Sequence, residues 1–396
     1  MSSGPLRIQA APPPSPRAAL TARVKLLAAR HGLTISGITS TLPFDGLTDT
    51  LTEHIEAGHV DGLDWFNAER ARIAGDVRHL HPTAQSIVAV GLAYWSGPTD
   101  KPDDGVRRGR ISRYAWGRDY HRVLKRRIRV FVGALESELG RSIETRELVD
   151  TARVSDRAIA ARAGVGWFGK HSNLIVPGHG SWVLLGEVLL DLDLEPDQPL
   201  NRNCGSCRIC LDRCPTGAIV EPYTVHAPLC ISYLTIELRG SIPHELRPKM
   251  GDWVYGCDVC QEVCPYTGAA AVADDEDLRP KSLDNAYPAL HWLLEMSQDE
   301  FGATYFGTPV PRTKRRGLAR NAAVALGNIG DDADIPVLGR ALTTHDESLV
   351  RGHAAWALGR IGGHGARATL DHARRREIDN TVREEIDLAL SMGGRT

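Results

Sequence analysis

The chain has 396 residues, of which 42% are hydrophobic and 24% charged, as in ordinary folded globular proteins. This length allows two or three domains with hydrophobic cores of their own. The net charge is only −2, which excludes a protein that binds polyanions through its overall charge. No apolar run reaches the roughly 18 residues that a membrane helix needs, and we therefore expect no membrane span.

The first half of the chain is predicted to contain short helices and strands. Residues 1–17 are rich in Pro, Ser and Ala and predict a disordered leader rather than a targeting peptide. The folded part should begin near Ala18. Hydrophobic spacing then predicts a helix at 19–31, a short strand at 35–38 and a further short segment at 64–72. It also predicts two buried strands, at 86–94 and 182–190.

A basic stretch follows the strand at 86–94. Ten Lys or Arg residues and one acid, Asp119, lie between Arg107 and Arg129. Apolar residues at helical spacing predict that its second half is an amphipathic helix ending at Gly140. The cations form either a solvated helix face or a surface that contacts phosphates while aromatic residues stack on unpaired bases. These aromatic residues are Tyr114, Trp116 and Tyr120.

Asp150 lies within a segment, 146–154, that is predicted to be a strand. A carboxyl group there is either a satisfied structural group or a functional group that faces a pocket, and the pattern alone favours the structural role. Ser155 and Asp156 are predicted to begin a short helix that ends at the glycines near position 165. The next run, GVGWFGKHSNLI, indicates backbone that approaches a large ligand closely and returns as a strand.

All eight cysteines lie in one stretch, between Cys204 and Cys264. The stretch begins with C-x2-C-x2-C-x3-C-P, which is typical of two-cluster bacterial ferredoxins, in which the fourth cysteine binds the other cluster. This pattern predicts one 4Fe-4S cluster on Cys204, Cys207, Cys210 and Cys264. It assigns the second cluster to Cys214, Cys230, Cys257 and Cys260.

Two other uses of the cysteines remain open from the sequence. Eight thiolates would fill two zinc sites of four ligands each, although three successive spacings of x2, x2 and x3 before proline are unusual for zinc ribbons. Disulfides are disfavoured because the chain has no secretory signal. Two clusters imply delivery of single electrons over a short distance, but they do not identify the acceptor.

The last part of the chain contains a repeated motif. RNAAVALGNIG and RGHAAWALGRIG recur 32 residues apart, as in HEAT-like pairs of helices. Two units are few for an independent solenoid, so we expect them to pack on the preceding domain. The run Arg312 to Arg316, with Arg320 one turn further on, is either solvated or suited to phosphate contact.

Taken together, these motifs resemble epoxyqueuosine reductases, cobalamin-dependent iron-sulfur enzymes that complete queuosine in tRNA. The resemblance rests on VDTARVSDRAIAARAGVGWFGKHSNLI, GSWVLLGE, NCGSCRICLDRCPTGAI, LCISYLTIELRG, YGCDVCQEVCP and RNAAVALGNIG. It implies an α+β multidomain fold with a leader over 1–17 and an N-terminal α/β cobalamin-binding domain over 18–198. A ferredoxin-like two-cluster domain would cover 199–275, and a C-terminal α-helical HEAT-like domain 276–396.

The resemblance also implies site residues. Asp150 matches the aspartate of the family's V-D-T/S motif, which is the proton donor, and we expect burial against the corrin to raise its pKa. Arg153 departs from the proline that many relatives carry near this position, and we expect it to alter the pocket rim. The residues expected near the corrin are Arg72, Leu174, Ser232, Arg239 and Asp258.

The implied activity is reduction of epoxyqueuosine to queuosine at the wobble position of tRNA, the final step of queuosine biosynthesis. The expected cofactors are cobalamin and two 4Fe-4S clusters, and an external one-electron donor would feed them. We expect a cytoplasmic monomer. The alternatives are a corrinoid enzyme like the reductive dehalogenases, a two-cluster electron carrier, or a helical tail that binds proteins rather than RNA.

Overall fold

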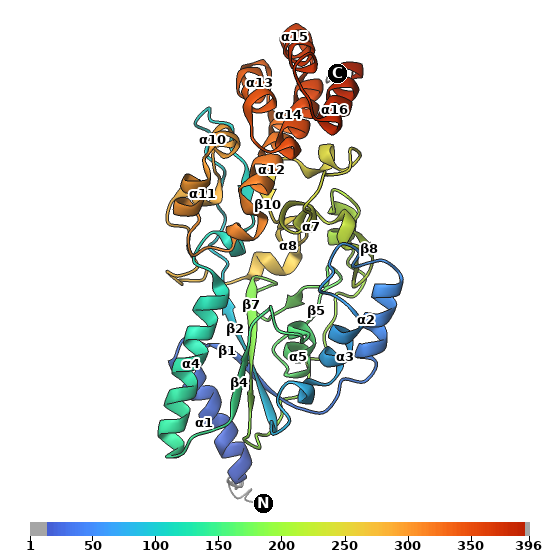
Figure 1. The fold of residues 1–396 in the computed structure, drawn as a ribbon. Coiled ribbons are helices and arrows are strands. Elements are labelled where there is room, and N and C mark those ends of the chain that lie inside the picture. The colour runs from blue at the N-terminus through green and yellow to red at the C-terminus, as the bar shows by residue number, and fades with distance from the viewer. Residues whose placement is uncertain (1–13, 393–396) are drawn as a thin grey trace, which may run out of the picture.

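The structure, a computed structural model, describes residues 14–392. The molecule is elongated, with a sheet domain at one end, the cysteine stretch in the middle and a helical tail at the other end (Figure 1). Within residues 14–392, no helix is both long enough and apolar enough to cross a lipid bilayer.

A four-stranded antiparallel sheet forms the centre of the N-terminal part, in the order β1-β2-β7-β4. Its strands are β1 Ile35–Ser40, β2 Ser86–Ala93, β4 Thr145–Leu148 and β7 Val183–Leu190. The strands predicted near 35–38, 86–94 and 182–190 are therefore confirmed. The predicted strand over 146–154 is wrong beyond Leu148, because the chain leaves the sheet there and turns.

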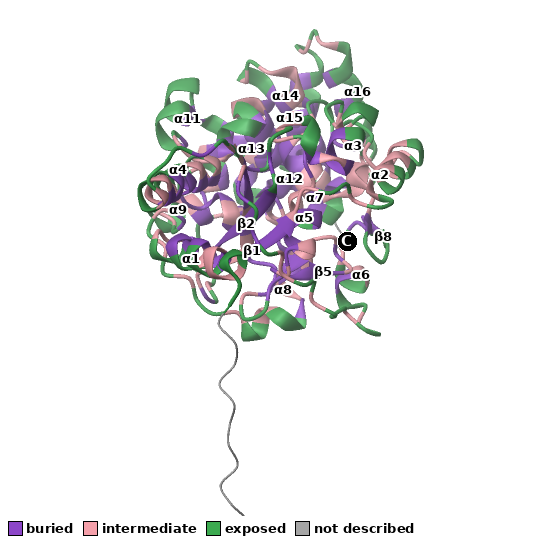
Figure 2. Cartoon of the chain, turned by 90° about the horizontal axis from the view of Figure 1, so that it is seen from below, coloured by how far each residue is buried: buried purple, intermediate pink, exposed green. Residues whose placement is uncertain are grey.

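Helices cover both faces of this sheet, as the buried sheet between exposed helix surfaces in Figure 2 shows. Val88 and Val90 of β2 pack with α1 Pro16–Arg30 and α4 Tyr120–Leu139. The alternate residues, Ile87 and Ala89, pack on the opposite side with α5 Asp156–Arg162. Since successive side chains of a strand point to opposite faces, burial of both faces explains why β2 is apolar throughout.

Two further helices lie beside α5 (Figure 1), namely α2 Leu47–Glu56 and α3 Ala68–Gly75. Helix α2 was not predicted from the sequence, and α3 begins four residues after the start of the segment predicted at 64–72. The predicted leader is wrong at Pro16 and Arg17, which open α1 because the Ser15 side chain caps the helix and proline suits its first position. Most of the leader prediction, residues 1–13, lies outside the described residues.

The cysteine stretch is built from short elements. They are β8 Ile219–Glu221, β9 Thr224–Val225, α6 Ile209–Arg213, α7 Ile231–Ile236, β10 Trp253–Tyr255 and α8 Val259–Glu262. Strand β10 pairs in parallel with β3 Arg110–Ile111, which comes from the basic stretch. This pairing joins the cysteine stretch to the N-terminal part of the chain.

The C-terminal tail is helical, and helices α12, α13, α14, α15 and α16 stack on one another (Figure 1). The helices of this part are α9 Leu283–Ala286, α10 Leu290–Glu295, α11 Gln298–Thr304, α12 Lys314–Ile329, α13 Ile335–Thr344, α14 Ser348–Ile361, α15 Gly363–Arg374 and α16 Asn380–Ser391. Helix α12 also packs against β10. The expectation that the repeats pack on the preceding part of the chain is confirmed.

Candidate active site and iron-sulfur centres

The eight thiols are all free. The charge of one cysteine shifts the pKa of another, and these pairwise effects connect the thiols in two groups of four. In the first group, burial and then the charges of Cys264 and Cys204 raise the pKa of Cys210. Burial also raises the pKa of Cys264, and the charges of Cys204 and Cys207 add to the effect. These four residues are the ones assigned to the first cluster from their spacing.

The second group contains the other four cysteines. Burial, followed by Cys257 and Cys230, raises the pKa of Cys260 well above its ordinary value, and Cys214 acts in the same direction. Cys210 lies in α6 and Cys260 in α8, and the two helices pack together. Each helix is followed by the cysteine that belongs to the other helix's group, as the x3-C-P spacing requires.

One further observation suits a cluster beside the first group of cysteines. Beside the first group, Trp167 packs with Cys264 and Cys204, and its buried indole N–H has no hydrogen-bond partner. A cluster sulfur would be a suitable acceptor, since cluster sulfurs commonly accept hydrogen bonds from the protein.

Asp150 lies two residues beyond β4, in a turn rather than in a strand. Its φ of 50° is in the left-handed region, which is uncommon for a residue other than glycine. The backbone N–H of Asp150 donates to Oδ1 of Asp156 at 3.3 Å. The Asp150 side chain is 55% exposed, so its carboxylate opens onto accessible space at the end of the sheet.

His121 is the main partner of Asp150. Its Nε2 lies 3.0 Å from Oδ2 of Asp150, and its Nδ1 lies 2.7 Å from Oδ1 of Asp119. Burial alone would raise the pKa of Asp150, but hydrogen bonds from His121 and Tyr120 outweigh burial and lower it. The predicted rise in the pKa of Asp150 depends on burial against a bound corrin and stays a prediction, while the His121 contact within the protein acts in the opposite direction.

Side chains of α3 contact the turn that contains Asp150. Arg70 Nη2 donates to the carbonyl oxygen of Ala152 at 2.7 Å, and the Arg70 guanidinium lies 4.7 Å from the ring centre of Trp65. Arg153, the predicted departure from the family, forms an exposed ion pair with Glu69 at 2.6 Å. Arg153 therefore connects the turn to α3 at the surface.

The residues expected near the corrin fall into two kinds. Arg72, Ser232 and Arg239 have accessible or partly accessible side chains. Leu174 and Asp258 have buried side chains with partners inside the protein. Asp258 accepts hydrogen bonds from the Ser112 hydroxyl and, at 2.8 Å, from the backbone N–H of Arg113.

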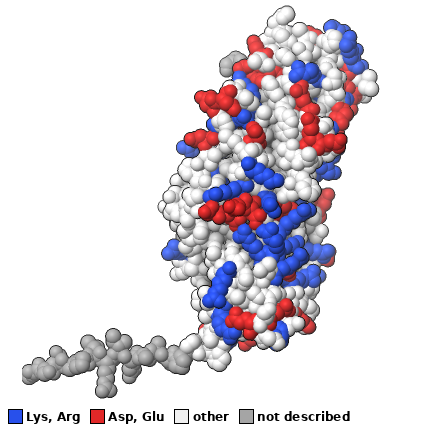
Figure 3. All heavy atoms as spheres, turned by 90° about the vertical axis from the view of Figure 1, so that its left-hand side faces the viewer, with Lys and Arg blue, Asp and Glu red and all other residues white. Residues whose placement is uncertain are grey.

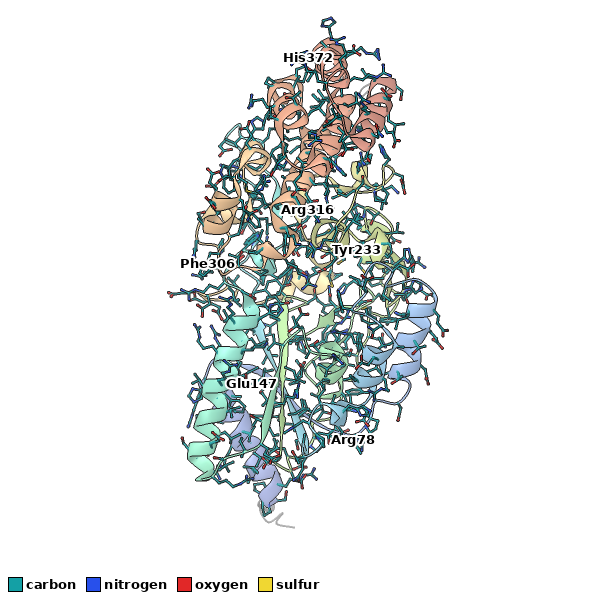
Figure 4. All side chains as sticks on the ribbon, viewed as in Figure 1. Arg78, Glu147, Tyr233, Phe306, Arg316 and His372 are labelled. Atoms are coloured by element: carbon teal, nitrogen blue, oxygen red, sulfur yellow. The ribbon has the colours of Figure 1, made fainter. Side chains whose placement is uncertain are left out.

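Arg239 and Asp150 approach the same region from opposite parts of the chain. Arg239 Nη1 donates to the carbonyl oxygen of Arg312 at 2.9 Å, and the positive charge of Arg312 acts on Asp150. Arg312 belongs to the short helix η6 Val310–Thr313, next to α12. Figure 4 shows Tyr233 of α7 and Arg316 of α12 at this same junction.

The basic stretch is only partly available to a ligand. Trp116 and Tyr120 are buried, so the predicted stacking on unpaired bases is wrong for these two rings. The Arg113 guanidinium lies 4.4 Å from the ring centre of Trp95 and 4.6 Å from that of Trp116. Arg320 has no exposed surface and donates to backbone carbonyl oxygens, so neither solvation nor phosphate contact, the two alternatives left open by the sequence, applies to it.

Three cations of α4 are paired with acids. Arg126 and Arg127 bind Asp277 and Asp275 at 2.5 and 2.8 Å, and Arg129 binds Glu147 at 3.0 Å. Figure 3 shows the corresponding face, where Lys and Arg side chains surround a group of Asp and Glu side chains. The surface is therefore of mixed charge rather than uniformly basic.

The sequence predicted no role for Asp119, His121 or Arg70 beside Asp150. The signal was available as the triplet Asp-Tyr-His at the predicted start of the helix, because an acid at that position caps a helix and an adjacent histidine is a common proton carrier.

Comparisons with known families agree with this organisation. Three family models match the chain: "4Fe-4S double cluster binding domain" at 203–267, "Epoxyqueuosine reductase QueG, DUF1730" at 75–151 and "HEAT repeats" at 314–391. The epoxyqueuosine reductase of Bacillus anthracis is 35% identical over 363 residues, which is 91% of this chain and 94% of the relative.

Solved structures show the same relationship. A crystal structure of epoxyqueuosine reductase with an epoxyqueuosine-modified tRNA-Tyr stem loop has a TM-score of 0.88 and 35% identity, and covers 94% of this chain and 98% of that one. A structure of the Bacillus subtilis epoxyqueuosine reductase with its catalytic loop swung out of the active site has a TM-score of 0.87 and 34% identity. The match covers 94% of this chain and 99% of that one. The chain belongs to the epoxyqueuosine reductase family.

Proposed function

We propose that this protein reduces epoxyqueuosine to queuosine at the wobble position of tRNA, the last step of queuosine biosynthesis. The observation that carries the proposal is the match, over 94% of the chain, to an epoxyqueuosine reductase solved with a modified tRNA stem loop. The family relationship favours this reading over a reductive dehalogenase or an electron carrier.

The proposed metal sites follow the two cysteine groups. Cys204, Cys207, Cys210 and Cys264 would hold one 4Fe-4S cluster, and Cys214, Cys230, Cys257 and Cys260 the other. Two observations support this assignment. The pKa effects between cysteines connect the same sets of four, and Cys214 and Cys264 each follow the helix that carries a cysteine of the other set. An external one-electron donor would deliver electrons to these clusters.

The proposed cobalamin site lies between the Asp150 turn and the junction of α7 with η6. Arg72, Ser232 and Arg239 offer polar side chains that suit the amide groups around a corrin ring. Leu174 and Asp258 would line the site through backbone atoms, because their side chains are buried. Bound cobalamin would supply the cobalt chemistry that removes the epoxide oxygen, using electrons from the clusters.

Asp150 is the proposed proton donor. Its half-exposed carboxyl group would deliver a proton to the epoxide oxygen as the carbon–oxygen bond breaks. Two electrons and two protons convert the epoxide to an alkene and water. The left-handed turn, held by Arg70 and Asp156, would keep the carboxyl group aimed away from the sheet.

The helical tail and the exposed cations near η6 would help to hold the tRNA, as HEAT-like repeats can offer an extended binding surface. We place the protein in the cytoplasm, together with tRNA, and expect it to act as a monomer.

The test is anaerobic reconstitution with iron, sulfide and cobalamin, followed by assay on a tRNA stem loop that carries epoxyqueuosine. Asp150→Ala should lower turnover by about 10²- to 10⁴-fold, the usual contribution of a positioned acid. Cobalamin binding, followed by its absorbance, should persist. Asp371→Ala, at an exposed site on α15, is the matched control. Normal turnover by Asp150→Ala with cobalamin bound would refute the assignment of Asp150.

A further inference from the structure

His121 lies between two carboxylates and contacts both. Asp119 accepts at 2.7 Å from one ring nitrogen, and Asp150 lies 3.0 Å from the other. Asp119 also accepts at 3.0 Å from the backbone N–H of His121, which fixes this carboxylate at the start of α4. A neutral imidazole donates from only one nitrogen, whereas an imidazolium donates from both. The two contacts therefore match the protonated form of His121.

The surroundings of His121 favour the same form. Burial alone would lower the pKa of His121, but the hydrogen bonds and charges of Asp119 and Asp150 raise it from 6.5 to about 9. The ring of Tyr120 stacks on His121 with ring centres 4.1 Å apart. Asp119 and Asp150 act on His121 directly. The other titratable or charged groups that interact with Asp150 are Tyr114, Tyr120, Asp156, Arg157, Glu187, Arg70 and Arg312.

From this geometry we propose that His121 is a positioning residue that stores the proton which Asp150 delivers to the substrate, and that Asp119 holds His121 in its charged form. The inference rests on the proposed function, because it concerns how the proposed donor obtains its proton. Neither Asp119 nor His121 needs to touch the substrate.

The proton moves in two linked transfers. The N–H bond at Nε2 of His121 breaks and an O–H bond forms at Oδ2 of Asp150, and this O–H bond then breaks as the same proton passes to the epoxide oxygen. His121 becomes neutral and Asp150 returns to its carboxylate form. With 23% of its side chain exposed, His121 can recover a proton from water. The transfers consume one proton and no electrons, so they balance without a further reactant.

The first test locates the proton without turnover. In the reconstituted full-length protein, nitrogen NMR of labelled histidine should show His121 protonated at both nitrogens up to about pH 8, above the ordinary transition of a histidine. Asp119→Asn keeps an acceptor oxygen but removes the charge, and it should move this transition to lower pH. A His121 that is neutral at about pH 7 in the unmodified protein would overturn the proposal.

The second test separates the storage of a proton by His121 from its structural role as a hydrogen-bond donor to Asp150. His121→Gln retains a group that can donate to Asp150 but carries no extra proton. At about pH 8 its turnover should fall tenfold or more, and it should approach that of the unmodified protein at about pH 5, where Asp150 takes a proton from water. Cobalamin binding and melting temperature should not change. His372→Gln, at the far end of the molecule (Figure 4), is the control.

The outcomes distinguish the two proposals. If the unmodified protein reduces epoxyqueuosine and His121→Gln has the same pH profile, only the inference about His121 is overturned. If the reconstituted, unmodified protein binds cobalamin but does not reduce the stem loop, the proposed function fails, and this inference fails with it.

Discussion

Glu187 is a carboxyl group with no exposed surface, in the middle of the sheet on β7. Asp156 is the ionisable group that acts on Glu187 most strongly, through its charge and through a hydrogen bond between the two side chains. Burial, and then Asp156, raises the pKa of Glu187 well above 4.5. Burial beside another acid thus favours the protonated form of Glu187, because a second negative charge there is costly.

This burial predicts a pH-dependent stability. Above about pH 5 the unfolded chain releases the Glu187 proton while the folded protein keeps it, so the free energy of unfolding should fall with rising pH by up to about 1.4 kcal/mol per pH unit. Glu187→Gln should remove this fall and be more stable than the unmodified protein at about pH 8. Urea unfolding at several pH values measures the difference.

The matched control for Glu187 is Glu276→Gln, at an exposed position. The difference in free energy of unfolding between Glu276→Gln and the unmodified protein should not change with pH. A stability difference for Glu187→Gln that is equally independent of pH would show that Glu187 ionises in the folded protein as readily as in the unfolded chain.

At the scale of the elements, the repeated L-G-x-I-G motif has a packing explanation. A Cβ added to Gly327 of α12 would lie 2.4 Å from the ring of Trp356 on α14. A Cβ on Gly359 of α14 would lie 2.8 Å from Cα of Ala389 on α16. The first glycine of each motif thus lies where the next helix approaches most closely, and it allows the helices of the tail to stack.

Gly327→Ala and Gly359→Ala should each destabilise the tail by about 1–3 kcal/mol, the usual cost of overpacking a core. Gly365→Ala in α15 is the control, because its Cβ would lie at an ordinary 3.5 Å from Ile335. This control should be neutral or slightly stabilising, since alanine favours a helix. Thermal unfolding measures all three, and equal melting temperatures for Gly327→Ala and Gly365→Ala would contradict the explanation.

At the scale of the whole molecule, the cysteine stretch and the helical tail share one hydrophobic core. The same cluster of buried residues includes Ile231 of α7, Val254 of β10 and Leu326 of α12. Arg320 adds polar links, since it donates to the carbonyl oxygens of Leu234 and Leu238 at 2.6 and 2.8 Å. The tail therefore supports the fold around the second cysteine group.

Removal of residues 314–396 should consequently affect the clusters as well as the tail. The shortened chain would expose the apolar surface of α7 and β10, and we expect it to aggregate or to lose the cooperative unfolding of the full chain. After reconstitution it should hold less iron per chain than the full-length protein treated in parallel. A soluble shortened chain with the full iron content would show that the cysteine stretch folds without the tail.

Local patterns were sufficient for many of the elements. The apolar runs predicted β2 and β7, the glycine at position 140 marked the end of α4, and the repeated motif predicted the stacked helices. The cysteine spacing predicted two cluster sites, and the assignment of four thiols to each site stays a prediction. These features depend on residues close together in the chain, or on a spacing that the bound group itself imposes. They can therefore be predicted from one sequence.

Contacts between distant residues decided the rest. The left-handed turn at Asp150, its pairing with His121 29 positions away, and the burial of Arg320 against a carbonyl 86 positions away have no signature in local periodicity. They also exclude Arg320 as a phosphate contact and add to Asp150 a neighbour, His121, that lowers its pKa. The charge state of a side chain is set by the groups that surround it in space, and only the tertiary structure brings those groups together.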